Sequence, residues 1–542
     1  MKQFLTPLAL SCSMFLTACS GDLFDVDTGG SGGVKVASTS NHNVYVPAGM
    51  QNVAAGDAHL DGFVYGAGSN LGDASALESQ ATYQPLAESA SDSVVALSSR
   101  DLVAFVAERE ASFVENDAED VLTVIENSLR TDVGGTANSI WKQQLGSSNE
   151  VVAAYIFTAN QSTTATDVVN TLLGEVALGS DSDDQELDNP ATPLSSEVST
   201  RSFEVYLGVL FAPRDGSVEG STDQVVMLGA VVPSEVAAAY SSLSAGVAST
   251  SNIGAKGASP QNSSKEVKVA SANSKADFLF VIDNSGSMSD DQATISSAAN
   301  TFFNTVSGSG TDFKIATITT DSSTLRDENS DGGFTSSETE FKLDVKPGTG
   351  GSTTETGIFY AEQALQVNGE RGATVDGSVV NAGYPRTGAS LSIIMFSDEP
   401  DFYNSISSGA DFDASDNLFI DKNYQVYGII SPSSSEGRDN GYVDLINNTN
   451  GTYADISNLT ALERIIEEIA LQTASASSQV KLDHSPIVVS IQVTVNGNTV
   501  AKSRTNGWQF NERLRTFSFY GTARLNAGDV VRVNYQYMPT SS

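Results

Sequence analysis

Asp283, Ser285 and Ser287 place one carboxylate and two hydroxyl groups on one short stretch of the chain. They follow the apolar run 278–282, which is short and β-favouring and therefore predicts a strand buried on both faces. From Ile295 onward, apolar residues recur at helical spacing. In open α/β sheets, ligands bind where a parallel strand ends and a helix begins. Because all three side chains offer hard oxygen donors, this loop suits Mg²⁺ or Mn²⁺ rather than zinc.

Two later segments add oxygen donors in the same kind of position. Thr354 precedes a segment with apolar residues at helical spacing, and Asp398 follows the apolar strand predicted over 391–397. Asp-x-Ser-x-Ser with such a threonine and such an aspartate resembles the metal-ion-dependent adhesion site of von Willebrand factor A (VWA) domains. The resemblance covers residues 275–475 and implies a metal site of five residues: Asp283, Ser285, Ser287, Thr354 and Asp398.

The resemblance implies adhesion to a protein or extracellular-matrix partner and no enzymatic activity. If the hydroxyl groups bind the cation directly while Asp283 and Asp398 act mainly through water, few anionic ligands quench its charge. The cation can then accept a carboxylate from the partner. Two other functions stay open. One is a structural subunit of an envelope or appendage assembly. The other is a metal-assisted hydrolase, whose general base would be Glu399 or Asp401, in place of the family's Thr-Asp-Gly ending.

Asp290 and Asp291 allow two interpretations. Together with the preceding Asp-x-Ser-x-Ser, they resemble the I-like domain of integrin β-subunits, in which paired aspartates hold a calcium ion beside the adhesion-site metal. Both acids also fall in the first turn of the predicted helix, where the helix dipole favours them. Ser289 and Gln292 supply a capping-box pattern for that helix. We favour the second interpretation.

The segment 327–338 matches the twelve-residue calcium loop of EF-hand proteins at every defining position. Asp327, Asn329 and Asp331 offer the early oxygen ligands, and Glu338 offers a bidentate carboxylate. The flanking helix pair of an EF-hand is missing, because both neighbouring segments predict strands: 313–318 and 340–345. A Ca²⁺ loop on a β-hairpin and a plain acidic turn therefore stay equally open.

Strands and helices alternate through the remainder of 275–475. Strands are expected over 424–430 and 451–456, and helices over 442–447 and 459–469. This alternation predicts an α/β fold with a doubly wound, mostly parallel sheet, Rossmann-like as in VWA domains.

The flanking regions predict two further domains. Residues 42–245 show no family pattern and predict an α+β domain, with these elements: helices over 102–107, 121–129 and 236–243, and strands over 151–157, 203–211 and 225–232. A linker rich in Ser, Asn, Gly and Ala is expected at 246–274. After residue 475 the apolar period changes from 3.6 to 2, which predicts a small antiparallel β module over 476–542.

The beginning of the chain predicts export and lipidation. Residues 1–18 hold a single apolar stretch that is too short to span a membrane and is typical of an export signal. The sequence Leu-Thr-Ala before Cys19 resembles a bacterial lipobox, which implies a lipoprotein signal peptide over 1–18 and a lipid on Cys19. Since a serine follows, the resemblance favours the bacterial outer membrane. Residues 19–41, rich in Gly, Ser and Asp, predict a flexible tether.

Composition limits the partners. The chain has 66 acidic and 28 basic residues and a net charge of −38, which argues against nucleic acid and against electrostatic binding to anionic lipid. Contact with a membrane is therefore expected through the lipid anchor alone. The acidity suits retention of divalent cations, and adaptation to a saline medium explains it equally well. Of the two cysteines, Cys12 lies in the leader and Cys19 is the expected site of the lipid, so no disulfide is expected within the mature protein.

Overall fold

The computed structural model describes most of the chain after residue 101 and shorter stretches before it. The described residues are 25–26, 34–39, 41–47, 50–54, 61–67, 102–111, 115–145, 149–178, 190–191, 197–213, 223–270, 275–289, 291–328, 332–403, 412–431, 441–456, 462–476, 478–503 and 506–539. The predicted signal peptide and Cys19 lie outside them. Among the helices that the structure describes, none is long and apolar enough to cross a membrane.

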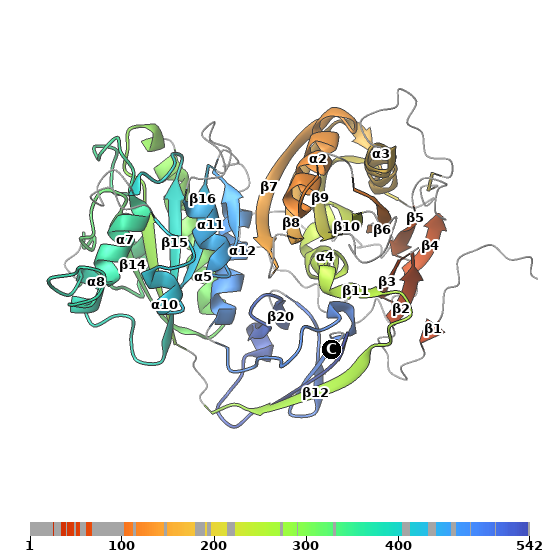
Figure 1. Cartoon of the computed structure of the whole chain (residues 1–542). Coiled ribbons are helices and arrows are strands. Elements are labelled where there is room, and N and C mark those ends of the chain that lie inside the picture. The colour runs from red at the N-terminus through yellow and green to blue at the C-terminus, as the bar shows by residue number, and fades with distance from the viewer. Residues whose placement is uncertain are drawn as a thin grey trace, which may run out of the picture.

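Figure 1 shows two larger parts side by side and a smaller part beneath them. The part that holds the predicted metal site, residues 275–476, is on the left, and the N-terminal part is on the right. The C-terminal module lies below both and contacts each of them.

The site-bearing part has five parallel strands in the order β14-β13-β15-β16-β17. They are β13 (Lys275–Ile282), β14 (Asp312–Thr319), β15 (Ala389–Ser397), β16 (Gln425–Ile430) and β17 (Tyr453–Asp455). The chain adds β14 on one side of β13 and β15 on the other, so the strand order reverses between β13 and β15. At such a reversal the crevice at the carboxyl ends of the strands is open to a ligand.

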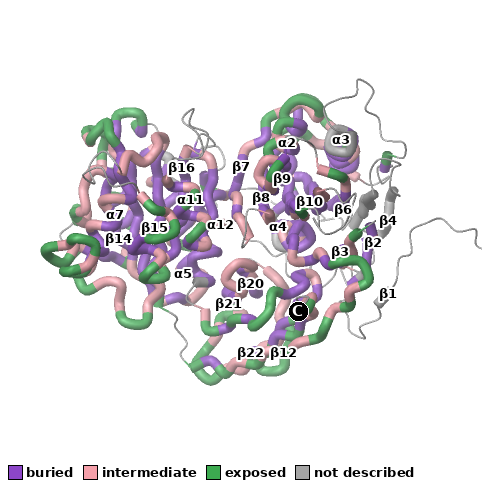
Figure 2. The backbone as a smooth tube through the Cα atoms, in the orientation of Figure 1, coloured by how far each residue is buried: buried purple, intermediate pink, exposed green. Residues whose placement is uncertain are grey.

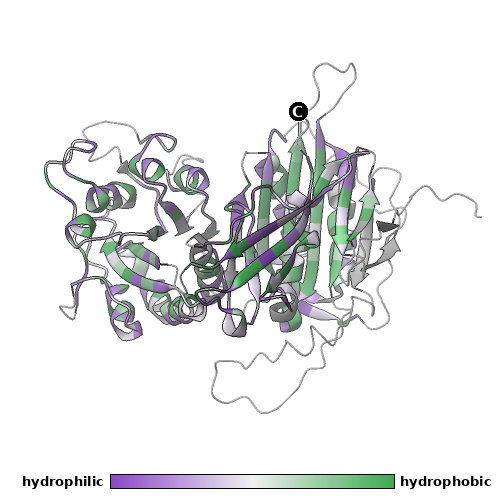
Figure 3. Cartoon of the chain, turned by 90° about the horizontal axis from the view of Figure 1, so that it is seen from below, coloured by the Kyte–Doolittle hydropathy of each residue, from purple (hydrophilic) through white to green (hydrophobic). Residues whose placement is uncertain are grey.

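Helices cover both faces of these five strands. On one face Phe278 and Phe280 of β13 share a core with α5 (Asp291–Gly308), α6 (Glu338–Asp344) and α12 (Leu462–Ala476). On the other face Leu279 and Val281 share a core with α7 (Gly357–Leu365), α8 (Ser378–Asn381), α10 (Leu418–Asp421) and α11 (Tyr442–Asn448). Figure 3 shows these helices carrying hydrophobic and hydrophilic residues side by side. The predicted α/β class and the doubly wound arrangement are confirmed for this part.

The sheet does not end at β17, which the sequence analysis did not anticipate. β17 pairs antiparallel with β7 through Tyr453 and Lys142, and seven antiparallel strands follow in the order β7-β8-β9-β10-β6-β5-β4. They are β4 (Met50–Ala54), β5 (Asp61–Ala67), β6 (Val103–Glu110), β7 (Gly135–Gln144), β8 (Glu150–Thr163), β9 (Thr200–Ala212) and β10 (Gln224–Pro233). In the described part of the chain, one twelve-stranded sheet therefore runs through both larger parts.

In the described part of the chain, three helices cover the N-terminal half of this sheet. They are α2 (Ala118–Thr131), α3 (Ala165–Leu178) and α4 (Ser234–Val247). α2 and α3 pack on one face, and α4 packs on the other. The helix predicted over 102–107 is wrong, because this segment belongs to β6. Its residues are buried on both faces between β10 and β5, and such a strand lacks the alternation that separates strands from helices.

The predicted tether and linker contain strands. The tether includes β1 (Asp25–Val26) and β2 (Val34–Ser38), which join β3 (His42–Pro47) in a second sheet. The linker over 246–274 includes β11 (Ile253–Ala255), which completes that sheet, and β12 (Gln261–Lys268). The described strands of both segments are therefore ordered where the composition indicates a tether or a linker. In the tether, β1 pairs with β2 and β2 pairs with β3, whereas the linker strands β11 and β12 pair with the distant β3 and β22 (Val530–Tyr537). Figure 2 shows β12 with little buried surface of its own.

The C-terminal module is antiparallel, as its period predicts, but takes one strand from elsewhere. Its larger sheet has the order β12-β22-β18-β19, and β20 pairs with β21. The module's strands are β18 (Gln492–Val495), β19 (Asn498–Val500), β20 (Trp508–Asn511), β21 (Thr516–Phe519) and β22 (Val530–Tyr537). Trp508, Phe517 and Val531 lie in its core. β12 supplies an edge strand that this short module does not itself encode.

Candidate metal centre

Four of the five predicted site residues form one chain of hydrogen bonds at the carboxyl ends of β13 and β15. Asp283 is fully buried, and its carboxylate accepts hydrogen bonds from the Ser285 amide and the Ser397 hydroxyl, each at 2.8 Å. The Oγ atoms of Ser285 and Ser287 are 2.8 Å apart, and Ser287 Oγ donates to Asp398 Oδ1 at 3.1 Å. β13 and β15 are adjacent parallel strands, so both ends open at the same edge of the sheet.

Thr354, the fifth predicted residue, lies exposed on the neighbouring loop before α7. This loop is tied to the first one. The Gly351 amide donates to the Asn284 carbonyl at 2.9 Å, and Asn284 Nδ2 donates to Asp321 Oδ1 at 3.1 Å. Asp321 Oδ2 in turn accepts the Ser352 amide at 3.0 Å. Thr354 therefore lies on a loop that is hydrogen-bonded to the loop of Asp283, and Asp321, just after β14, joins the two loops.

Gln292 has a different role from the predicted one. Its Nε2 donates to the Asp283 carbonyl at 2.9 Å and to the Gly348 carbonyl at 2.7 Å, and its Oε1 accepts the Gly348 amide at 3.0 Å. Instead of serving a capping box, this buried side chain fixes two loops of the site. Asp291 lies in the first turn of α5, as the dipole interpretation expects, and Asp290 lies outside the described residues.

The site concentrates negative charge. Burial, together with Asp398, raises the pKa of Asp283. Burial raises the pKa of Glu355 to about 8, and Asp283, Glu399 and Asp321 add to the shift. The pKa of Glu399 is raised by burial, Asp398 and Asp283. Among the described residues, no lysine, arginine or histidine forms an ion pair with any of these five acids: Asp283, Asp321, Glu355, Asp398 and Glu399.

Glu355 is a residue that the sequence analysis missed. It is fully buried directly after Thr354, and one carboxyl oxygen accepts a hydrogen bond from Thr320 Oγ1. Its other oxygen, Oε1, has no hydrogen-bond partner. The only sequence signal was an acid beside the predicted ligand threonine, and nothing in the local pattern indicated that it would be buried.

Asp401 does not present its carboxylate to the metal site. Oδ2 accepts the Ile358 amide and Oδ1 accepts the Tyr403 amide, each at 2.9 Å, so Asp401 holds the N-terminus of α7. Burial raises its pKa to about 7. Of the two acids considered as a general base, only Glu399 therefore remains beside the predicted ligands.

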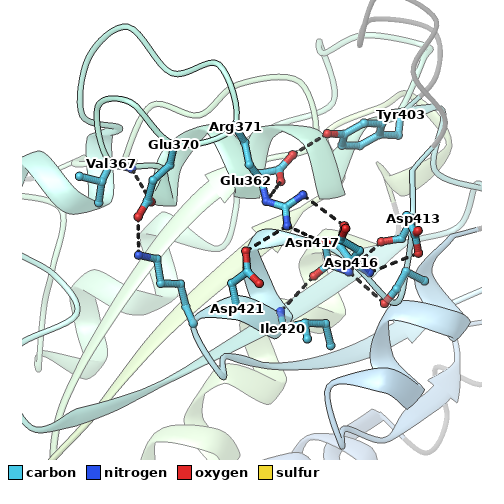
Figure 4. A network of polar contacts seen from close by, with 12 residues as sticks. Glu362, Val367, Glu370, Arg371, Tyr403, Asp413, Asp416, Asn417, Ile420 and Asp421 are labelled. Carbon is cyan, nitrogen blue, oxygen red and sulfur yellow. Dashed lines mark hydrogen bonds and ion pairs between the residues drawn. The ribbon is translucent and has the colours of Figure 1, made fainter.

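A polar network behind α7 fixes the segment that carries Asp401 (Figure 4). Tyr403 donates to Glu362 of α7 at 2.5 Å, and Arg371 lies 3.9 Å from the same carboxylate. Arg371 also pairs with Asp416 and Asp421, each at 3.0 Å. The network joins α7, the segment after β15 and the region of α10.

The strand predicted over 340–345 is wrong, since this segment lies in α6. The Ser337 hydroxyl accepts the Glu340 amide at 3.4 Å as the helix N-cap, and Phe341 and Val345, four residues apart, are buried. The Ser-x-x-Glu pattern was present in the sequence and predicts this helix start.

The predicted calcium loop is therefore followed by a helix and not by the second strand of a hairpin. Asp327 Oδ2 accepts the Gly332 amide at 3.3 Å, whereas Asn329 and Asp331 lie outside the described residues. Glu338 is the first residue of α6 and pairs with Lys342 at 2.6 Å. Calcium binding here stays a prediction.

The donor set of the candidate metal centre fits a hard divalent cation. Two serine hydroxyls and the Asp398 carboxylate lie within hydrogen-bond distance along one chain, and all are oxygen donors of the kind that Mg²⁺ and Mn²⁺ prefer. In the described ranges, no cluster of three or more His, Cys, Asp or Glu residues has the arrangement of a metal cage. A cation here would therefore depend on hydroxyl groups as well as carboxylates.

Comparisons with known proteins give limited similarity. No family model and no curated protein matches the chain. Among solved structures, a von Willebrand factor type A protein from Catenulispora acidiphila is similar at 12% identity and a TM-score of 0.27, over 53% of this chain and 67% of that one. The pilus adhesin SpaC from Lactobacillus rhamnosus GG is similar at 12% identity and a TM-score of 0.28, over 52% of this chain and 42% of that one.

Proposed function

We propose that the protein binds a protein or matrix partner through Mg²⁺ or Mn²⁺ held at the carboxyl edge of β13 and β15. The observation that carries this proposal is the hydrogen-bonded chain of Asp283, Ser285, Ser287 and Asp398. When bound, the cation would supply an electrophilic position for a carboxylate of the partner. Both oxygens of Asp283 already accept hydrogen bonds from protein groups. This suits a residue that orients the other ligands without binding the cation directly, so that it does not neutralise the positive charge of the cation.

The surrounding acids support a metal-gated interaction. Without a cation, the ionised carboxylates of the site repel a partner's carboxylate; Glu355, whose pKa is raised to about 8, adds little to this repulsion at pH 7. With a cation, the same groups retain the metal, and the serine and threonine hydroxyls leave much of its charge available. The protein's own residues would thus make the partner's affinity depend on the metal, with no chemical turnover of the partner.

Capture of extracellular-matrix and envelope proteins by the intact protein tests this proposal. Wild type, Asp283→Ala and Thr354→Ala are each compared in Mg²⁺ and in EDTA, with Glu463→Ala, an exposed acid on α12, as the matched control. We expect Mg²⁺-dependent capture by wild type and by the control. We expect none by Asp283→Ala, and reduced capture by Thr354→Ala, because the latter removes a neutral donor and no charge.

Equal capture under all conditions would contradict the metal-gated mechanism and favour a structural subunit of an envelope or appendage assembly. Release of a chemically altered partner would favour the hydrolase instead.

We also propose that a lipid on Cys19 anchors the protein in a bacterial outer membrane. The lipobox-like sequence before Cys19 supports this proposal. Cys19→Ser should abolish labelling by fatty acid and release the protein from membranes, because acyl chains would be its only anchor. A Cys19→Ser protein that stays on membranes after a carbonate wash would rule the anchor out.

A further inference from the structure

The joint between the N-terminal part and the C-terminal module contains a short 3-10 turn, η1 (Thr250–Asn252), which follows α4. Asn252 is fully buried, and its Nδ2 atom donates to the Gly246 carbonyl of α4 at 2.7 Å. Its Oδ1 atom accepts the Val489 amide of the module at 3.3 Å. A single buried side chain of η1 therefore ties the end of α4 to the module.

Two carboxyl groups meet at the same turn. The Ser249 hydroxyl donates at 2.6 Å to Oε2 of Glu512, which belongs to the module and directly follows β20. The adjacent Thr250 hydroxyl donates at 3.0 Å to Oε2 of Glu150, the first residue of β8. Both hydroxyl residues are buried. Two neighbouring hydroxyl groups therefore each hold one carboxyl group, and the two carboxyl groups come from opposite sides of the joint.

The charges at this joint do not balance when both carboxyl groups are ionised. Lys502 of the module reaches across the joint, because a Cβ atom on Gly246 would lie 2.9 Å from its Nζ atom. Among the described residues that line the small pocket beside Glu512, Lys502 is the one base. The other charged or titratable residues that line this pocket or adjoin Glu512 in the chain have these partners: Glu468 has Arg464, Tyr206 has Glu204, and Arg513 has Asn447 and Asn450.

This imbalance changes the ionisation of both acids. Burial raises the pKa of Glu512 to about 7; Glu150 adds to this shift, whereas the Ser249 hydrogen bond and Lys502 oppose it. Burial also raises the pKa of Glu150, and the Thr250 hydrogen bond opposes that shift. In the unfolded chain Glu512 ionises near its ordinary value of 4.5, so the stability that its protonated form gives is lost as the pH rises from 4.5 through 7.

We propose that the contact between the N-terminal part and the C-terminal module is a pH-sensitive joint, in which Ser249 and Thr250 hold Glu512 and Glu150 side by side. While Glu512 is protonated, the ammonium group of Lys502 offsets the one remaining carboxylate, and the joint stays closed. When both acids are ionised, their repulsion loosens the contact between η1 and the module. Pairing of β12 with β22 keeps the module attached. None of these residues belongs to the candidate metal centre, and the joint needs no metal ion to respond to pH.

The two tryptophans of the chain make the joint observable by fluorescence. Trp141 lines the pocket beside Glu512 and is 8% exposed, whereas Trp508 lies in the core of the module. In a Trp508→Phe protein, Trp141 is therefore the single reporter. We expect its emission maximum to move to longer wavelength between pH 5.5 and pH 8.5, with a midpoint near pH 7, because the loosened joint admits water to Trp141.

Two substitutions in the Trp508→Phe background assign this shift to the joint. Glu512→Gln keeps an acceptor for the Ser249 hydroxyl but cannot ionise, so the shift should disappear. Glu463→Gln on the exposed face of α12 is the matched control and should leave the shift unchanged. Emission that does not change with pH, or a shift that persists in Glu512→Gln, would overturn the proposal.

Hydrogen exchange of the unaltered protein gives a test that does not depend on the variants folding. After correction for the intrinsic effect of pH, the Val489 amide should exchange several-fold faster at pH 8.5 than at pH 5.5, because its bond to Asn252 crosses the joint. The Val533 amide in the middle of β22 should show no comparable increase, since the module itself stays folded. Equal corrected rates for Val489 at the two pH values, or an equal increase at Val533, would contradict a loosening of the joint.

Discussion

Glu355 shows how far the environment of a single residue can move its chemistry. Its side chain is fully buried, one oxygen lacks a partner, and Asp283, Asp321 and Glu399 lie close enough to oppose its ionisation. In the folded protein, Glu355 therefore holds its proton up to a pKa of about 8, well above its ordinary value of 4.5. Such a carboxyl group lowers the stability of the protein at pH values at which it is ionised in the unfolded chain but protonated in the folded chain.

This shift predicts a pH-dependent difference between wild type and Glu355→Gln. Between pH 4.5 and about 8 the folded wild type binds one proton more than the unfolded chain at this residue, so its stability falls as the pH rises. The glutamine side chain of the variant does not ionise, so the variant's free energy of unfolding does not fall with pH for this reason. Its unfolding free energy, relative to wild type, should therefore rise by at least about 1 kcal/mol from pH 5 to pH 8.5.

Urea unfolding in EDTA at the two pH values measures this difference, with Glu463→Gln on the exposed face of α12 as control. The control should show no such trend. A difference between Glu355→Gln and wild type that does not change with pH would mean that Glu355 ionises normally in the folded protein.

Single site residues can be predicted from the sequence where their types and spacing form a recognisable pattern. Asp283, Ser285 and Ser287 could be found because they follow a recognisable buried strand. Gln292 and Asp321 could not be assigned their roles, because those depend on loops that are distant in sequence and meet only in the folded sheet.

Among the elements, the contact between the two site loops depends on a glycine. A Cβ atom on Gly351 would lie 2.3 Å from Cγ of Asn284, far closer than two such atoms can approach. Asn284 cannot easily move aside, because its Nδ2 donates to Asp321 and its carbonyl accepts the Gly351 amide. Any side chain at position 351 therefore pushes the loop of Thr354 away from the loop of Asp283.

Gly351→Ala should weaken Mn²⁺ binding several-fold while the core stays folded, because both loops lie outside the core. Gly350→Ala is the matched control, since a Cβ there meets nothing within 4 Å. Titration with Mn²⁺ and far-ultraviolet circular dichroism measure the two effects. Equal Mn²⁺ affinity for both variants would show that the loop contact does not shape the site.

Elements were predictable where local signals agree with the tertiary environment. The strands ending at 282 and 397 contain short, continuous apolar runs, and the helix over 462–476 follows a clear apolar period. β6 was mistaken for a helix because a strand buried on both faces does not alternate apolar and polar residues. Its strand conformation is determined by pairing with β10 and β5, which the local sequence does not reveal. α6 was mistaken for a strand because Phe341, Leu343 and Val345 alternate with polar residues, although Ser337 and Glu340 carry a helix-start signal.

In the whole molecule, the parts are more closely joined than the predicted domain series indicates. The twelve-stranded sheet crosses from the site-bearing part to the N-terminal part at Tyr453 and Lys142. Lys142 also pairs with Glu119 at 3.3 Å and Glu126 at 2.5 Å of α2. No local pattern could predict this junction, because a pairing between strands more than 300 residues apart leaves no trace in either segment. An isolated 275–475 fragment would expose the edge of β17, so the intact chain is the proper material for experiments.

Direct titration of the intact protein with Mn²⁺ tests the central claim, that Asp283, Ser285, Ser287, Thr354 and Asp398 hold a divalent cation. Isothermal calorimetry should show saturable binding by wild type and by the Glu463→Ala control. Asp283→Ala should weaken the affinity by at least about tenfold, because it removes a carboxylate that orients the site. No Mn²⁺ binding by wild type, or unchanged affinity in Asp283→Ala, would contradict the account.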